Sequence, residues 1–450
     1  MRLIRTWPTE WFVLFGAGCD VRGSMPIAVQ TGGRASLHSP RSLEPNFSRR
    51  AFCIQGLLCD VVTIEEVTQK VAASIKAARS CNIVTPNANF LRLARSDPDF
   101  RDAVLASDLS MIDGMPLVWF ARALGISVPD RACGSDLFDS LMRQTDERFN
   151  AFFLGATHDI GQRVRRRLNE GTSGVRCAGV YAPGFGSVES MSDQGILDVI
   201  NGAGADLLII SIGARKGLLW TSRNEGSLAP PIICNLGATV NFVAGSITRA
   251  PIFFRKHGLE WLWRVKEEPA LWTRYAQDLM VLTSVLFGHI LPCLAEYRLH
   301  KPSPAQLSAA CLRRRQRDAT YTIEFIGAWT NDNIAPVREA LSEATRTQGN
   351  LEIDLNGVTY ADAGFLGQIL LAYGYQRRMR RGFVLRASRK PIQRILRLHG
   401  CGYLLHAGDS QIEPRQTARR LHPAGKAAVR RLWQSTLDAC GAAWINPHRH

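Results

Sequence analysis

Short apolar runs alternate with amphipathic helical segments from Ala51 to about residue 241, and this alternation restricts the fold more than any other feature. The runs include CNIVTP, SMIDG, AFFLGA, ADLLIISIG and PIICNLG, and helical patterns such as TIEEVTQKVAASIKAA lie between them. Apolar strands joined by helices are typical of the parallel sheets of α/β proteins. We therefore predict an α/β domain whose sheet is covered by helices on both faces.

A second, smaller α/β pattern begins near Thr320 with the strand-like run TYTIEFIGAW and ends near GYLL. A chain of 450 residues exceeds the usual size of one hydrophobic core, so two folded domains are expected. The predicted organisation is a flexible leader (1–50), a first domain (51–241), a basic helical appendage of that domain (242–299), a linker (300–318), a small α/β domain (319–408) and a basic tail (409–450).

Ligands of parallel α/β sheets bind at the carboxyl ends of the strands. Polar or glycine residues stand at these ends in the predicted first domain: Thr85, Asn87, Asp113, Gly155, Gly213 and Gly237. Because the carboxyl ends of parallel strands lie along one edge, we expect these residues to face one crevice of a Rossmann-like sheet.

Asp113 is the candidate for acid–base chemistry. It follows the apolar run SMI and precedes Gly114, where the missing side chain lets a ligand or a second backbone come close. A carboxylate there can act as a general base if burial brings its pKa near the working pH. The same position suits a turn aspartate that bonds to its own backbone, and spacing alone favours that interpretation.

Two neighbouring motifs have both a functional and a structural interpretation. TPNANF places Thr85, Asn87 and Asn89 between a strand and a helix, where they could hold sugar hydroxyls, although helix capping explains one of them. Arg131, in RACGSDL, could bind a phosphate through its fork of N–H donors or could be an ordinary surface arginine.

The formal net charge of +16 suggests an anionic partner: nucleic acid, an acidic membrane face or a phosphorylated substrate. Nucleic acid is disfavoured because no recognition fold with interleaved aromatic residues accompanies the charge. The eleven cysteines form no CxxC pair and no zinc-site spacing, which predicts reduced thiols in a cytoplasmic protein without a structural metal. The apolar stretch from Leu279 contains His289 and Pro292, which favours an interfacial or packed helix over a spanning one.

Several blocks between about residues 52 and 278 resemble, in order, the WecG/TagA/CpsF family of glycosyltransferases. They include TPNANFLRLARSDPDF, SMIDGMPLVW, RACGSDLF, FFLGA and LGATVNFVAGSITRAPIFFRKHGLEWLWRVKEEP. The resemblance implies transfer of a sugar from a UDP-sugar donor, with inversion and without an essential metal or other cofactor. The implied acceptor is a polyprenyl-diphosphate-linked saccharide at the inner membrane face, with the enzyme peripherally attached.

The resemblance also implies roles for individual residues. Asp113 matches the family's proposed base, Thr85 and Asn87 its polar site loop, and Arg131 an arginine that faces acceptor or phosphate. Arg249, Arg264 and Arg274 match basic positions of the C-terminal appendage, which helps to close the site at the membrane.

The presumed donor pocket departs from the family pattern. After DLLIISIG, family members usually carry Gly-x-Pro-Lys-Gln-Glu, whereas this chain has GARKGLLW. Lys216 and Trp220 remain, but Arg215, Gly217 and Leu218 replace the proline, glutamine and glutamate. These changes leave the donor sugar open among N-acetylmannosamine, its uronic acid and glucose.

The small C-terminal domain resembles a STAS domain through LEIDLNGVTYADAGFLGQILLAYGYQRR. Phosphorylated members of that family carry a serine at the start of the helix, where this chain has Asp362, Ala363, Gly364 and Phe365. We expect constitutive docking of a protein partner or ligand sensing there; a helix start that packs only on its own sheet is the equal alternative.

The leading hypothesis is an inverting hexosyltransferase of exopolysaccharide or surface-glycan assembly with a fused STAS-like module. The alternative is a catalytically degenerate regulatory or scaffold protein that acts through the STAS-like domain. The departure of the GARKGLLW segment from the family pattern supports this alternative.

Overall fold

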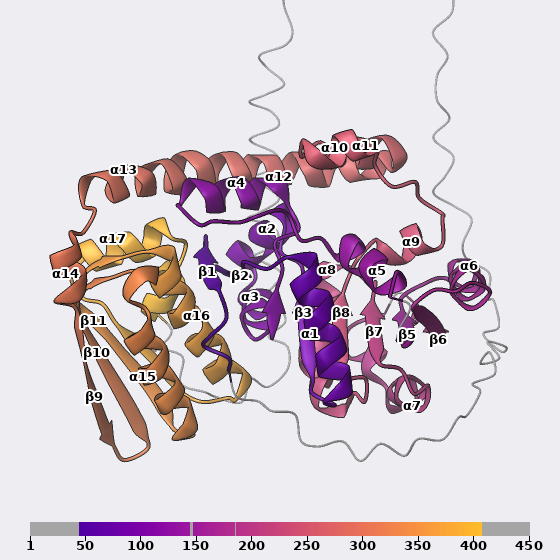
Figure 1. Ribbon diagram of the computed structural model, residues 1–450. Coiled ribbons are helices and arrows are strands. Elements are labelled where there is room, and N and C mark those ends of the chain that lie inside the picture. The colour runs from indigo at the N-terminus through magenta and orange to yellow at the C-terminus, as the bar shows by residue number, and fades with distance from the viewer. Residues whose placement is uncertain (1–44, 145–146, 185, 407–450) are drawn as a thin grey trace, which may run out of the picture. The chain divides into compact units, whose positions relative to one another are not determined.

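A computed structural model describes residues 45–144, 147–184 and 186–406. The predicted tail (409–450) and most of the predicted leader (1–44) lie outside these residues. The predicted first domain is built on a six-stranded sheet in which every pairing is parallel, with the order β4-β3-β8-β7-β5-β6 (Figure 1). Its strands are β3 (Cys81–Val84), β4 (Leu109–Ser110), β5 (Phe149–Leu154), β6 (Val175–Tyr181), β7 (Leu207–Ile210) and β8 (Ile232–Asn235).

Both faces of this sheet are covered, as the alternating pattern predicts. In β7, Leu207 and Ile209 pack in one hydrophobic cluster with α1 and α5, while Leu208 and Ile210 pack in another with α7 and α8. The helices of the domain are α1 (Ile64–Lys76), α2 (Ala88–Ser96), α3 (Pro98–Leu105), α4 (Met115–Ala123), α5 (Gly134–Met142), α6 (His158–Asn169), α7 (Gln194–Gly202), α8 (Ala214–Asn224) and α9 (Thr239–Val243).

Local capping sets two of the helix boundaries. Thr63 and Glu66 form a capping box at the start of α1. The segment after β3 forms two consecutive helices, α2 and α3, because Asp97 is extended and caps α3 while Pro98 occupies the first turn of α3. Proline disfavours a helical conformation in the preceding residue, which ends α2 at Ser96.

The folded chain begins before the boundary predicted at Ala51. Strands β1 (Ala51–Ile54) and β2 (Leu57–Asp60) form an antiparallel hairpin. Arg49 is buried, with its guanidinium Nε 2.9 Å from Asp60 Oδ1 and Nη1 3.0 Å from the carbonyl oxygen of Ser107. The prediction of a flexible leader is therefore wrong for the described residues up to 50, because burying this arginine requires a fixed carboxylate partner.

The appendage is helical, as predicted. It contains α10 (Ile252–Lys256), α11 (Glu260–Glu267), α12 (Trp272–Val285), a π-helical turn (Leu286–Ile290) and α13 (Leu291–Leu299). Figure 1 shows α12 and α13 following one another as one long helical segment. By length and composition alone, the helix Pro269–Leu299 could cross a membrane, with a mean hydropathy of 1.7.

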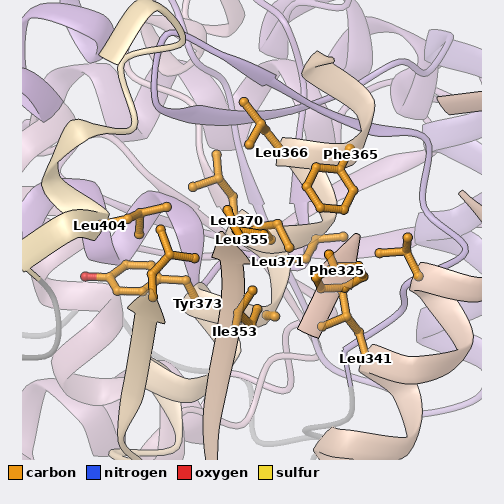
Figure 2. Packing of buried hydrophobic residues seen from close by; sticks show 14 of the residues in the cluster. Phe325, Leu341, Ile353, Leu355, Phe365, Leu366, Leu370, Leu371, Tyr373 and Leu404 are labelled. Atoms are coloured by element: carbon orange, nitrogen blue, oxygen red, sulfur yellow. The ribbon is translucent and has the colours of Figure 1, made fainter. Parts of the chain in front are cut away.

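The small domain has a four-stranded sheet in the order β12-β11-β10-β9. Strands β10, β11 and β12 are parallel, and β9 pairs with β10 in antiparallel fashion. The elements are α14 (Pro304–Ser308), β9 (Cys311–Arg317), β10 (Thr320–Trp329), α15 (Ala335–Arg346), β11 (Asn350–Ala361), α16 (Ala363–Arg378), β12 (Phe383–Arg386) and α17 (Lys390–Leu398). Figure 2 shows its core, where Phe325, Ile353 and Phe365 pack.

The predicted linker over 300–318 is wrong in its second half. Residues 311–317 are strand β9, and Arg317 pairs with Thr320 across a tight turn at Asp318, which has a φ of 48°. The basic run LRRRQR has no apolar alternation that would predict a strand. It forms one at the edge of the sheet, where charged side chains remain in solvent. The small domain thus begins before residue 319.

Candidate active site

Asp113 lies directly beyond β4, where the loops after two neighbouring strands meet. Its backbone N–H donates to the carbonyl oxygen of Pro86 at 2.9 Å. Gly114 is the N-cap residue of α4, and a Cβ added there would lie 3.3 Å from Cβ of Asn87. This close approach explains the glycine and brings Asp113 beside the TPNANF loop, as expected for strand ends in one crevice.

The surroundings of Asp113 raise the pKa of its carboxyl group toward neutral pH. Burial raises the pKa of Asp113 from 3.8 to about 8, and the negative charges of Glu260 and Asp136 contribute to that rise. Arg131 and Arg249 act in the opposite direction. A turn aspartate in solvent would not have this environment, so the geometry favours acid–base chemistry.

The two arginines near Asp113 are fixed by carboxylates. Arg131 Nη1 lies 2.5 Å from Glu260 Oε2, and the Arg131 side chain is only 11% exposed. Arg249 pairs with Asp136 and Asp139 and donates to Ser135 Oγ at 3.1 Å. Arg131 is therefore no ordinary surface arginine. Pairing fixes its orientation, and a guanidinium has five N–H donors, more than one carboxylate uses.

Polar side chains of the loop after β3 and of the start of α2 make hydrogen bonds within the protein. Asn87 Oδ1 accepts from the backbone N–H of Phe90 at 3.2 Å and caps α2, which confirms the capping interpretation for this residue. Asn89 Oδ1 accepts from Arg92 at 2.7 Å. Thr85 is buried, with Oγ1 3.5 Å from the carbonyl oxygen of Asn235 at the end of β8. Roles of these three side chains toward a sugar stay predictions.

The other predicted strand-end residues follow three further strands of the same edge, of which β8 lies next to β3. Gly155 follows β5, Gly213 caps α8 after β7, and Gly237 follows β8; all three have positive φ. Lys216 Nζ donates to the carbonyl oxygen of Gly186 at 3.0 Å. Four strand spacings separate β4 from β5, so Gly155 lies about 19 Å from the Asp113 end of the row. The structure thus places the predicted residues along one edge without gathering them at one point.

Two further predicted arginines gather around Tyr275 in the appendage. Arg264 pairs with Glu268 at 2.5 Å and lies over the ring of Phe242, and Arg274 lies over the ring of Tyr275 at 4.7 Å from its centroid. Burial raises the pKa of Tyr275, and the charges of both arginines lower it. Glu260 also acts on Tyr275, so this group adjoins the Arg131–Glu260 pair.

Glu260 and Asp136 were missed as site residues in the sequence. Both lie inside the motifs that carry the family resemblance, Glu260 in GLEW and Asp136 in GSDL. The sequence does not show that Glu260 pairs with Arg131, because the two residues are 129 positions apart. Packing of the appendage brings Glu260 to this place: Gly258, with a φ of 71°, lies against Met115 in α4. Asp136 comes from α5 of the sheet domain.

Two cavities, of about 380 and 440 Å³, border Arg49 and Lys70, and the first also borders Ser80 at the amino end of β3. Asp113 lines neither of them, and its assignment rests on its chemistry. Across residues 45–144, 147–184 and 186–406, no three His, Cys, Asp or Glu side chains are arranged to hold a metal ion.

Comparison with known proteins identifies the domain that carries this site. Residues 52–292, more than half of the chain, match the glycosyl transferase WecG/TagA/CpsF family. The chain belongs to the WecG/TagA/CpsF family of glycosyltransferases. Residues 312–406 match the STAS domain family described as Mlab, STAS domain. This second match begins within β9, in agreement with the corrected boundary of the small domain.

Three relatives of this glycosyltransferase are named N-acetylglucosaminyldiphosphoundecaprenol N-acetyl-beta-D-mannosaminyltransferase. The protein from Bacillus spizizenii is 26% identical over 45% of this chain and 78% of its own length. That from Bacillus subtilis is 23% identical over 43% and 73%, and that from Staphylococcus aureus 22% over 40% and 70%. The matched region of the WecG/TagA/CpsF family includes the sheet, Asp113 and most of the appendage.

Proposed function

We propose that this glycosyltransferase transfers a sugar from a UDP-sugar, with inversion, to a polyprenyl-diphosphate-linked saccharide. The environment of Asp113 carries the proposal: a carboxyl group with a pKa raised to about 8, under the electrostatic influence of two fixed arginines, at the carboxyl edge of a parallel sheet. The names of the three relatives, which specify an undecaprenol-linked acceptor, support the acceptor class.

In the proposed reaction, the Asp113 carboxylate takes the proton of the acceptor hydroxyl. The hydroxyl oxygen attacks the anomeric carbon of the donor, and the bond from that carbon to the UDP oxygen breaks on the opposite face. Negative charge grows on the leaving diphosphate, which Arg131 and Arg249 are suited to stabilise because their guanidinium groups are already oriented. We propose that no metal cofactor is required, since these cations supply the charge.

We further propose that the enzyme works at the inner face of the cytoplasmic membrane, bound through its appendage. Large apolar side chains are exposed on α4 and the appendage: Trp119, Phe253, Trp261, Leu262, Trp272, Leu279, Met280, Phe287, Leu291 and Leu299. The opposite side of the long helix is bound to protein; Asp278, for example, is buried and paired with Arg92. One apolar face and one protein-bound face favour a helix that lies in the interface over one that spans the membrane.

The donor in this proposal is a UDP-linked N-acetylmannosamine, its uronic acid or glucose, used in exopolysaccharide or surface-glycan assembly. The names of the three relatives favour the first sugar. The altered segment at Lys216 separates this chain from the family pattern on the donor side, so the donor must be identified by experiment.

The test is a screen of UDP-sugars with a short-chain prenyl-diphosphate-linked N-acetylglucosamine acceptor, with products detected by mass spectrometry. We expect one donor to extend the acceptor by one sugar. Asp113→Asn should lower the rate by about 10²–10⁴-fold, the usual contribution of a general base. Asp159→Asn, at an exposed position of α6, is the matched control and should keep the rate.

Transfer by Asp113→Asn at the rate of the unsubstituted enzyme would remove Asp113 from the proposed role. Absence of transfer with every donor, together with absence of UDP binding by calorimetry, would count against the whole proposal.

A further inference from the structure

The main helix of the STAS domain, α16, is buried on nearly all sides. Fourteen of its sixteen residues are buried, whereas a helix that covers a sheet normally leaves one face in solvent. The second side of α16 packs on the glycosyltransferase domain at two glycines. A Cβ at Gly367 would overlap the carbonyl oxygen of Ala51, and one at Gly374 would overlap that of Leu105. These backbones meet more closely than any larger residue would allow.

Hydrogen bonds and ion pairs also join α16 to the glycosyltransferase domain. Tyr373 Oη donates to Asp102 Oδ1 at 3.0 Å, and Arg377 Nε lies 2.9 Å from Asp102 Oδ2. Arg378 is 12% exposed and pairs with Asp108 at 2.9 Å and also with Glu225. These three side chains of α16 thus contact α3, the segment before β4 and the end of α8. Such an interface is extensive, specific and internal to one chain.

The STAS domain also holds the long apolar helix of the appendage. Tyr297 Oη in α13 accepts from the backbone N–H of Ala363, the first residue of α16, at 3.1 Å. His399, which is buried, lies 3.0 Å from Tyr297 Oη and 3.4 Å from Cys293 Sγ through Nε2. In the π-helical turn, His289 Nδ1 lies 3.0 Å from the carbonyl oxygen of Arg397.

The long helix is therefore fixed at two places. Toward its start, Asp278 binds Arg92 of α2 at 2.7 Å. Toward its end, Cys293 and Tyr297 are held by the STAS domain, while Phe287 and Leu291 on the other side stay exposed. The π-helical turn lies between these two anchors, where it adjusts the rotation of one half relative to the other.

We propose that the partner of α16 is the glycosyltransferase domain of the same chain, and that the STAS domain is an internal mount. Here "mount" means that it holds α13, with its exposed apolar face, in a fixed position beside the catalytic domain. The role at the membrane rests on the proposed function. A protein partner of the STAS domain, expected from its sequence, would have to bind a surface other than this face of α16.

The experiment uses the full chain with a protease site inserted after Pro302, in the exposed segment between α13 and α14. After cleavage, only the interface joins the two pieces. We expect them to elute together from a sizing column. Gly374→Ala should weaken their association by about tenfold or more, because added atoms in a packed interface force it apart. Gly202→Ala, where no atom lies within 4 Å of the added Cβ, is the matched control.

Two more readouts test the mount itself. Amide hydrogen exchange in α13 should rise in cleaved Gly374→Ala and stay low in cleaved Gly202→Ala. Transfer to an acceptor embedded in phosphatidylglycerol vesicles should fall by about tenfold, because α13 no longer holds the catalytic domain in a fixed position against the membrane, while transfer to a short soluble acceptor is unchanged.

Separation of the unsubstituted pieces after cleavage, or an equal loss with both acceptors, would overturn the mount. If the intact protein transfers sugar to neither acceptor, the proposed function fails instead. Elution and hydrogen exchange then still decide the inference, because neither depends on activity.

Discussion

Asp113 shows how one residue acquires chemistry from distant charges. Burial alone would raise its pKa, but the pairs Arg131–Glu260 and Arg249–Asp136 place both signs of charge around it. The resulting pKa of about 8 lies near the pH at which a base is most effective, where it is often ionised and still holds the proton it receives.

The pH dependence of kcat/KM follows from this pKa. The base must be ionised, so the rate should rise by about tenfold per pH unit below pH 8 and level off above it. Initial rates between pH 5 and pH 10 with the preferred donor measure this profile. A rate already constant between pH 5 and pH 8 would contradict ionisation of Asp113 as the controlling step.

Glu260→Gln should shift that profile in a known direction. The Glu260 carboxylate raises the pKa of Asp113, so replacing it with an uncharged amide should move the rising limb to lower pH. Asp99→Asn, a similar loss of charge at an exposed position of α3, is the control and should leave the limb in place. A limb that moves to higher pH in Glu260→Gln would show that loss of the Arg131 partner matters more than loss of charge.

At the scale of elements, the long helix of the appendage combines a protein-bound side with an exposed apolar side. Phe287, in the π-helical turn, is 65% exposed, although exposed phenylalanine is unfavourable in water. An apolar surface of this kind is explained if lipid covers it.

Phe287→Glu should weaken binding to phosphatidylglycerol vesicles by about tenfold or more, the effect of losing a buried aromatic side chain. Flotation of the protein with vesicles in a density gradient measures the bound fraction. Val384→Glu, at an exposed apolar position of β12, is the control and should float like the unsubstituted protein. Equal flotation of both variants would remove the long helix from the membrane contact.

Elements with a clear period were predictable, and those decided by neighbours were not. The buried strands of the first sheet and the capped helix α1 follow from local patterns of apolar residues and from Thr63. Strand β9 carries four arginines, a pattern without an apolar period, and forms because β10 offers an open edge. The hairpin β1–β2 buries Arg49, which the composition of 21–50 did not suggest.

At the scale of the whole molecule, one hydrophobic cluster is shared by the two domains. Ala51, Cys53 and Leu58 of the hairpin pack in the same cluster as Ile353 and Leu370 of the STAS domain. Such a shared core couples the stability of both domains, so we expect them to unfold together.

Arg378→Ala tests this coupling. Replacing Arg378 removes its charged hydrogen bonds to Asp108 and Glu225, which should cost about 1.5–3 kcal/mol of unfolding free energy. Denaturant unfolding should show one transition shifted to lower concentration. Arg386→Ala, whose partner Glu352 lies on the STAS sheet and whose side chain is 59% exposed, should cost about 1 kcal/mol or less. Two separate transitions in the unsubstituted protein would contradict a shared core.

The sequence alone determined what depends on neighbours along the chain: the α/β class, the two domains, the helix caps, the family motifs and Asp113 as the candidate base. Tertiary structure decided what depends on residues far apart in sequence. It added Glu260 and Asp136 to the site and showed that Asn87 and Asn89 make hydrogen bonds within the protein. It also buried α16 of the STAS domain on nearly all sides. The physical reason is that a carboxylate's pKa and a glycine's close contact depend on packing, which local periodicity does not encode.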